Sequence, residues 1–359
     1  MSAINFDNKN YESGKYPLFL GEDLGLYDTI NITYNSIEKN YLKQRSQMWA
    51  ETEVSLDQSR KDFATCSENN YNVMIKNLSY QWSADSLAKS IISLFSPFIS
   101  NNELAGGFMF QSAMEIIHSR TYSEIIRQCI KDPQEIFTEI RANSNIFDRM
   151  ETVEKAFSEL KTAGHKYSLG MIEVDDNLRL IILKGIFALL ALEGIQFMSS
   201  FSATFAMGEQ QLFVGACKLI SKIMLDEILH SQLDLDIIES LLKEPEWKRV
   251  YDNNSGELKA ILDEVVKSEE QWAEYLFSEG RVVLGLNAPL MKEWLWHNAS
   301  PIYRRLKLPY DFPAMSKNPL PWMDKWMNPD KVQTANMEIQ KTEYKLNVSS
   351  TDIDEEFDF

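Results

Sequence analysis

Apolar residues recur at three- and four-residue intervals through most of the chain, which is the period of an α-helix. Proline interrupts helices, and it stands at Pro17, Pro97 and Pro133 and is then absent until Pro245. The stretch between the last two is rich in Leu, Ile, Met, Ala, Glu and Lys, and strand-like alternation is nearly absent. The pattern predicts an all-α protein built from a run of long helices.

The segment 178–207 is the most apolar part of the chain. Its length would permit a membrane span, but Lys184 and Glu193 lie inside it. A carboxylate near the centre of a bilayer costs roughly 2.5 kcal/mol or more, even on a lenient scale. We therefore expect a buried core helix that carries one functional acid, and no membrane association.

The composition changes toward the C-terminus. After Pro301 the chain is rich in proline and aromatic residues, and from about residue 332 polar and acidic residues dominate up to the final Phe359. Such a polar segment buries too little apolar surface to order itself. Its terminal aromatic residues favour a docking peptide over the alternative, an inert solubilising tail. We predict three parts: an N-terminal arm (1–30), a helical domain (31–315), and a Pro/aromatic segment with a disordered tail (316–359).

The charge and the cysteines restrict the class of protein. Acidic residues outnumber basic ones by 53 to 36, for a net charge of −17, which disfavours binding to nucleic acid or anionic lipid. Cys66, Cys129 and Cys217 are odd in number and form no CxxC motif, which indicates a reducing compartment. Polar residues follow the first four, so we expect no secretory signal and a cytoplasmic location.

Two of the four histidines stand in the same local pattern, Glu115-x-x-His118 and Glu227-x-x-His230. Residues at i and i+3 of a helix lie on one face about 5–6 Å apart, so each pair can present a carboxylate and an imidazole to one point. Both pairs lie in long apolar helices, where an uncompensated carboxylate is costly. A bound cation is the expected compensation.

Two further acids complete the pattern of a carboxylate-bridged dimetal bundle, in which two helices each give a lone acid and two each give Glu-x-x-His. Glu193 is the lone acid of its apolar stretch, and Asp85 lies in a helical segment about thirty residues before Glu115. Taken singly, each residue could be an ordinary charge or a core histidine. Together and in this order, they favour a site for iron or manganese rather than zinc or copper.

Tyr122 lies one turn after His118 on the same helix face. It could be a plain core residue, but a phenol beside an oxygen-activating metal site can also act as a one-electron donor. Such a radical would survive only in a dry pocket. Phe197, Phe201 and Ile223 have the helical spacing from the acids to line it.

These motifs resemble the small, radical-generating subunit of class I ribonucleotide reductase, over nearly the whole chain. The resemblance is carried by EIIHSRTY at 115–122, by DEILH at 226–230, and by ALE at 191–193 with Phe197 and Phe201 after it. Gln111 departs from the family pattern, because several bacterial members carry Trp there.

The resemblance implies a ferritin-like helical bundle with a carboxylate-bridged dimetal site. In this family the first metal ion would be bound by Asp85, Glu115 and His118. The second would be bound by Glu193, Glu227 and His230. The cofactor would be two oxo-bridged iron ions, with manganese possible instead, and Tyr122 would hold the stable radical.

The resemblance also implies a path for electrons and protons to a separate catalytic subunit. Trp49 would be linked to His118 through Asp226, and Tyr344 in the tail would be the tyrosine at the subunit interface. Glu338 would assist proton transfer there. The protein would be a homodimer, and its tail would dock on the large subunit, which alone binds ribonucleotides.

Two other functions remain open at this point. The first is a di-iron oxidase, desaturase or ferritin-like iron store, in which Tyr122 is incidental core. The second is a metal-free adaptor whose Phe-ended tail recruits a partner.

Overall fold

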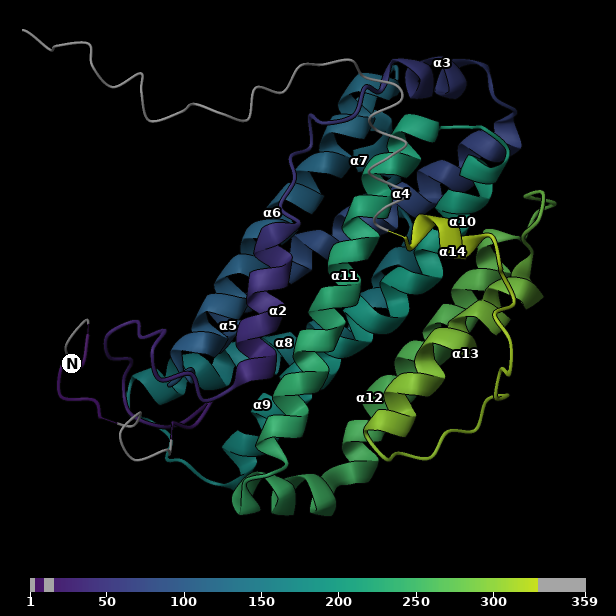
Figure 1. The fold of residues 1–359 in the computed structure, drawn as a ribbon. Coiled ribbons are helices and arrows are strands. Elements are labelled where there is room, and N and C mark those ends of the chain that lie inside the picture. Colours follow the sequence, from purple (N-terminus) through teal and green to yellow (C-terminus); the bar gives the residue numbers. More distant parts are fainter. Residues whose placement is uncertain (1–3, 10–15, 329–359) are drawn as a thin grey trace, which may run out of the picture.

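The computed structural model describes residues 4–9 and 16–328, and within these ranges every regular element beyond isolated bridges is a helix (Figure 1). The chain therefore has the all-α fold that the hydrophobic pattern predicts. In chain order the elements are α2 (Asn35–Ser46), α3 (Asp57–Thr65), α4 (Glu68–Ala88), α5 (Ile91–Phe95), α6 (Asn102–Cys129), α7 (Pro133–Ala142), α8 (Ser144–Ser168), α9 (Asp176–Ala191), η1 (Leu192–Gln196), α10 (Phe197–Glu209), α11 (Val214–Leu241), α12 (Pro245–Leu276), α13 (Ala288–Arg305) and α14 (Met323–Trp326).

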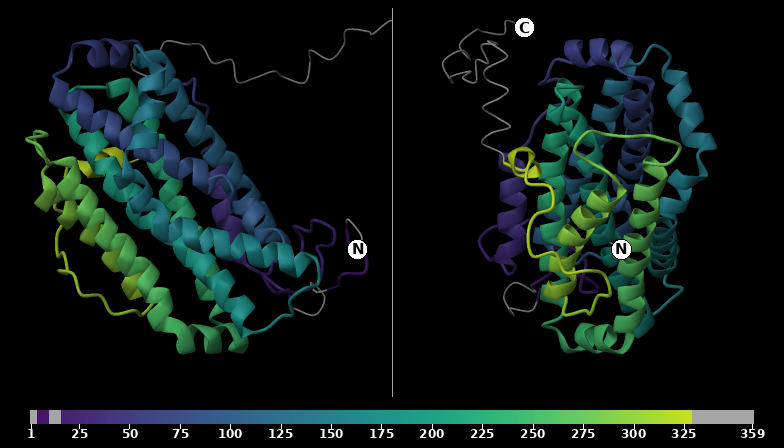
Figure 2. Two further views of the ribbon diagram at one scale, coloured as in Figure 1. Left: turned by 180° about the vertical axis from the view of Figure 1, so that it is seen from behind. Right: turned by 90° about the vertical axis from the view of Figure 1, so that its right-hand side faces the viewer.

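Four helical rods form the centre of the bundle: α4, α6, α11 and the continuous rod of α9, η1 and α10. The views in Figure 2 show these rods running along one another. Helix α2 packs against α6 and α11, while α8 and α12 pack against α9. Helix α13 packs against α12 and α10 and forms the outer layer on that side. The faces that the central rods turn toward one another are buried.

Capping side chains fix where the central helices begin. The side chain of Asn101 accepts a hydrogen bond from the backbone N–H of Leu104 at 2.9 Å and starts α6. Asp175 does the same for Leu178 at 2.8 Å and starts α9. Each cap satisfies a backbone donor that the first helical turn leaves without a partner.

The apolar segment 178–207 is a core helix, as its sequence predicts. Almost all of its side chains are buried, with Arg179, Leu180 and Lys184 only partly so. None of the helices in the described ranges is both long enough and apolar enough to cross a bilayer. The sequence did not predict the π-helical turn η1, which widens the helix at Glu193. Such turns are rare and occur mostly at functional sites.

A buried ion pair holds this π-helical turn in place. Arg149 of α8 donates two hydrogen bonds to the carboxylate of Glu269 on α12, and both side chains are at most 1 % exposed. Arg149 also donates to the backbone oxygen of Gln196 at 3.2 Å, and the Gln196 amide donates back to the Arg149 carbonyl at 2.7 Å. The guanidinium lies 3.3 Å from the ring centre of Tyr80. The end of η1 is thus bonded to two helices outside the central four.

Candidate metal centre

The four central rods bring the six predicted ligands together in the core. They are Asp85 on α4, Glu115 and His118 on α6, Glu193 on η1, and Glu227 and His230 on α11. All six side chains are fully buried. Burying four carboxyl groups together is costly, because each charged oxygen needs a cation, a proton or a hydrogen-bond donor.

The six residues form two overlapping groups. Within each group, one potential ligand atom from every member lies within 4.8 Å of the others. The first group is Asp85, Glu115, His118 and Glu227, and the second is Glu115, Glu193, Glu227 and His230. The family resemblance implies that Glu115 binds one ion and Glu227 the other. In the structure both acids belong to both groups, which is the position of bridging ligands.

Both histidines turn the Nδ1 atom toward the carboxylates. His118 Nδ1 lies 3.1 Å from Glu227 Oε1, and His230 Nδ1 lies 3.0 Å from Glu115 Oε1. His230 Nδ1 is also 2.9 Å from Glu193 Oε2. Each Glu-x-x-His motif therefore meets the other head to tail across the antiparallel helices α6 and α11.

The electrostatics of the site show uncompensated negative charge. Burial, followed by the charge of Glu115, raises the pKa of the Asp85 carboxyl well above its ordinary value. Burial and the neighbouring Glu227 do the same to the pKa of Glu193. Burial opposes protonation of His118, but the charge of Glu115 together with hydrogen bonds to Asp226, Glu115 and Glu227 outweighs burial and raises the pKa of the imidazole well above its ordinary value. Positive charge is what these groups lack.

The donor set fits a dimetal site. Among the described residues, neither carboxylate oxygen of Asp85 nor of Glu115 has a hydrogen-bond partner. Unpartnered buried oxygens beside an imidazole nitrogen are the ligands that hard divalent metal ions take up. Iron and manganese both accept this set of ligands.

A hydrogen-bond chain connects the site to Trp49, as the resemblance implies. Trp49 Nε1 donates to Asp226 Oδ2 at 2.7 Å, and the same oxygen lies 3.0 Å from His118 Nε2. Because the ionised Asp226 oxygen can only accept, His118 Nε2 carries a hydrogen and donates it to Asp226. The Trp49 and His118 rings are nearly parallel, with centres 6.0 Å apart.

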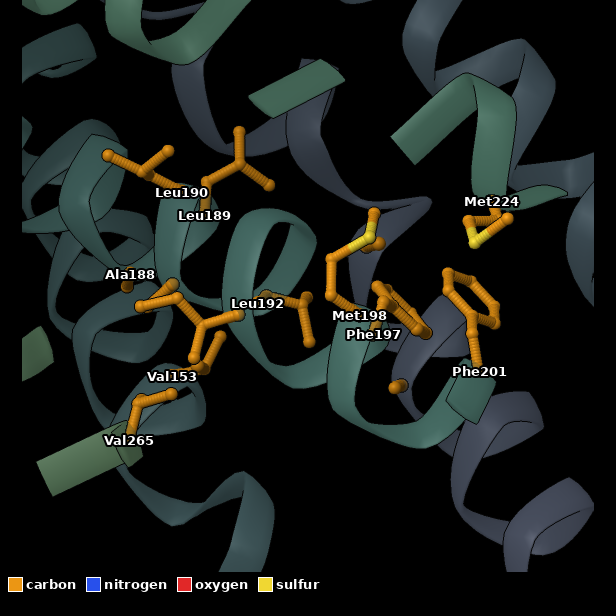
Figure 3. Packing of buried hydrophobic residues seen from close by; sticks show 14 of the residues in the cluster. Val153, Ala188, Leu189, Leu190, Leu192, Phe197, Met198, Phe201, Met224 and Val265 are labelled. Atoms are coloured by element: carbon orange, nitrogen blue, oxygen red, sulfur yellow. The ribbon is translucent and has the colours of Figure 1, made fainter. Parts of the chain in front are cut away.

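Tyr122 is fully buried, and its Oη has no hydrogen-bond partner in the described part of the chain. Burial, reinforced by the charge of Asp85, raises the pKa of the phenol well above its ordinary value. Phe197 and Phe201 stack with ring centres 5.8 Å apart, and Met224 lies beside Phe201 (Figure 3). Ile223 is fully buried as well. The phenol thus lies in the dry core.

Gln111 has a role that the sequence did not reveal. Its Nε2 donates to Glu193 Oε1 at 3.0 Å, so it holds one of the candidate ligands. The only signal in the sequence is its place one turn before Glu115 on the same helix face. Tyr344, Glu338 and the predicted docking tail lie outside the described residues.

Comparisons with known proteins agree with this geometry. Residues 27–319 match the family model "Ribonucleotide reductase, small chain". The ribonucleoside-diphosphate reductase subunit beta of Haemophilus influenzae is 29 % identical, over 99 % of this chain and 98 % of its own.

Solved structures show the same fold. The R2 subunit of ribonucleotide reductase from Clostridium botulinum superposes with a TM-score of 0.80 at 21 % identity, covering 91 % of this chain and 98 % of that one. The dimanganese(II)-NrdF of Streptococcus sanguinis has a TM-score of 0.67 at 18 % identity, covering 84 % and 99 %.

We predict that the purified protein takes up about two divalent ions per chain and that Glu227→Gln loses this capacity. In the wild type, each of the two ions, at about a hundred times its dissociation constant, should add about 2.7 kcal/mol to the free energy of unfolding. Metal analysis and denaturant unfolding with and without Mn²⁺ measure both effects.

Glu239→Ala is the matched control, because Glu239 is a partly exposed acid on the same helix that pairs with Arg305. It should bind metal like the wild type. Without metal, Glu227→Gln should be less stable than the wild type near neutral pH, because hydrogen bonds to Glu193, His118 and His230 outweigh burial and hold the pKa of the Glu227 carboxyl well below its ordinary value. Undiminished metal uptake by Glu227→Gln would contradict the assignment.

Proposed function

The chain belongs to the ribonucleotide reductase small-chain family, and from this membership we propose that it generates and holds the tyrosyl radical of a ribonucleoside-diphosphate reductase. The observation that carries the proposal is the buried cluster of two head-to-tail Glu-x-x-His motifs, with Tyr122 one helical turn beyond His118. As a beta subunit it works with a large subunit, on which ribonucleotides are reduced.

Asp85, Glu115, His118, Glu193, Glu227 and His230 would hold two metal ions, which when bound supply one-electron oxidising power from oxygen. The residues do the rest. Glu115 and Glu227 belong to both groups, so each could offer an oxygen to either ion. Tyr122 is fully buried, so bulk solvent would not reach a phenoxyl radical formed there. We propose iron as the metal. Manganese is the alternative, since the similar protein of Streptococcus sanguinis is a dimanganese form.

We propose that the oxidising equivalent leaves through His118, Asp226 and Trp49. The support is the unbroken pair of hydrogen bonds from the imidazole to the indole, with both Asp226 and Trp49 at most 5 % exposed. From Trp49 the path continues to Tyr344, with Glu338 assisting proton transfer, both in the C-terminal tail.

We further propose a homodimer that docks the large subunit through the tail. Met109 and Ile116, seven residues apart on one face of α6, are 57 % and 51 % exposed, and Leu42 of α2 is 41 % exposed. An apolar strip of this kind on a helix next to the site favours a second copy as its cover. All three cysteines are free, which supports a cytoplasmic location.

Tyr122→Phe should abolish the tyrosyl signal in electron paramagnetic resonance after addition of Fe²⁺ and oxygen, because phenylalanine has no phenolic hydrogen to lose. Metal binding should be unchanged. Tyr80→Phe is the control, since Tyr80 is also fully buried with an unpartnered Oη, and it should keep the signal. A chain that binds two ions without any tyrosyl signal would instead be an oxidase or an iron store.

Trp49→Phe should keep radical formation and metal content but lower reductase activity with the large subunit by about 10–100-fold. The reason is loss of the indole N–H that reaches Asp226. Trp296→Phe is a matched control, because Trp296 donates to Glu270 at the same 2.7 Å distance, away from the site. Full activity in Trp49→Phe would rule out this path.

Truncation before Asp352 should leave a homodimer with an intact radical that no longer binds the large subunit. Sedimentation of the full-length and truncated chains, alone and with the large subunit, measures both properties at once. A truncated chain that still forms the complex would show that docking lies elsewhere, and a monomer would contradict the apolar strip as a dimer face.

A further inference from the structure

The two halves of the site are related by an approximate two-fold axis between α6 and α11. His118 meets Glu227 and His230 meets Glu115 at nearly equal distances, 3.1 and 3.0 Å. Residues about four apart lie on the same face of a helix, so residues one turn before and after these motifs on α6 should also face their counterparts on α11. Tyr122 and Asp234 occupy equivalent places, each four residues after a histidine.

The partners of these two residues also correspond. One turn before Glu227 is Ile223, which comes level with Tyr122. One turn before Glu115 is Gln111, which comes level with Asp234. The position paired with Tyr122 is therefore apolar, whereas the position paired with Asp234 is an amide. The distinction is inherent in the sequence of the two helices.

Asp234 is fully buried, and within the described residues neither of its carboxyl oxygens has a hydrogen-bond partner. Two neighbouring polar atoms are in the same condition. They are Oε1 of Gln111, whose Nε2 holds Glu193, and Nε2 of His230, whose Nδ1 faces the carboxylates. A lone buried polar atom is rare, and four on three adjacent side chains call for a shared explanation.

The unpaired donor and acceptor atoms of Asp234, Gln111 and His230 match those of a bound water molecule. With Nδ1 directed at a metal position, His230 Nε2 carries a hydrogen and needs an acceptor. Asp234 offers two acceptor oxygens, and Gln111 Oε1 needs a donor. A water molecule accepts from the imidazole and donates to the oxygens, and buried waters commonly have about three such partners.

We propose that Asp234 is a positioning residue for His230, acting through ordered water that it shares with Gln111. This inference rests on the proposed metal site and goes beyond it. Asp226 fixes His118 by a direct hydrogen bond of 3.0 Å to its Nε2, whereas Nε2 of His230 has no direct acceptor among the described residues. Asp234 fills that role at the other end of the cluster, and through Gln111 the same water also steadies Glu193.

The test is metal affinity in Asp234→Leu, Asp234→Asn and the wild type, with Mn²⁺ as the probe and free Mn²⁺ followed by electron paramagnetic resonance. Asp234→Leu should weaken one of the two ions by about 10–100-fold and leave the other unchanged. Asp234→Asn keeps a polar oxygen and should lose less. Asp236→Asn is the control, since Asp236 lies on the same helix and bonds to Arg305.

Denaturant unfolding without metal separates positioning from plain stability. A merely structural Asp234 would change the stability of the metal-free protein in the variants while both ions bind as in the wild type, and that result would overturn the inference. If Asp234→Leu does not fold, Asp234→Asn decides alone. Wild type that takes up no metal would instead refute the proposed function.

A high-resolution crystal structure supplies the second readout. It should show ordered water within hydrogen-bond distance of Asp234, His230 Nε2 and Gln111 Oε1 in the wild type, and none bridging them in Asp234→Leu. A dry pocket in the wild type would overturn the inference, whatever the metal content of the crystal.

Discussion

The structure depends on one constraint: four fully buried carboxyl groups lie in two overlapping clusters, and within each cluster one ligand atom from every member lies within 4.8 Å of the others. Their mutual repulsion and lost hydration destabilise the metal-free fold. Two histidines offset part of this, because their pKa values are raised toward the charged form. The electrostatic cost that the histidines do not offset favours the binding of divalent cations.

The surrounding helices keep these groups from moving apart. The π-helical turn directs Glu193 inward, and the buried Arg149–Glu269 pair ties the end of that turn to α8 and α12. On the opposite side, Asp226 and Trp49 tie His118 to the segment after α2. Residues that touch no metal position therefore set the geometry of those that do.

The helical class, the core segment and the candidate ligands could all be predicted, because each leaves a periodic signal in the sequence. The Glu-x-x-His spacing places two ligands on one face without knowledge of the fold. The π-helical turn at Glu193 and the pairing of Arg149 with Glu269 could not be predicted, since they depend on contacts between distant helices. The sharing of Glu115 and Glu227 between both groups needed the antiparallel register of α6 and α11, which only the fold supplies.

The wide separation of the candidate ligands along the chain, from Asp85 to His230, has a consequence for the order of assembly. Four helices must converge before any ion can find a full set of donors, and closing such long loops is slow compared with forming local turns. A metal ion therefore cannot nucleate this fold. In this respect the protein differs from small zinc-finger domains, which fold when they bind zinc. The apolar core has to be stable enough for the chain to fold before the buried carboxyl groups have bound a metal ion. Metal ions would therefore bind to, and dissociate from, a protein that is already folded.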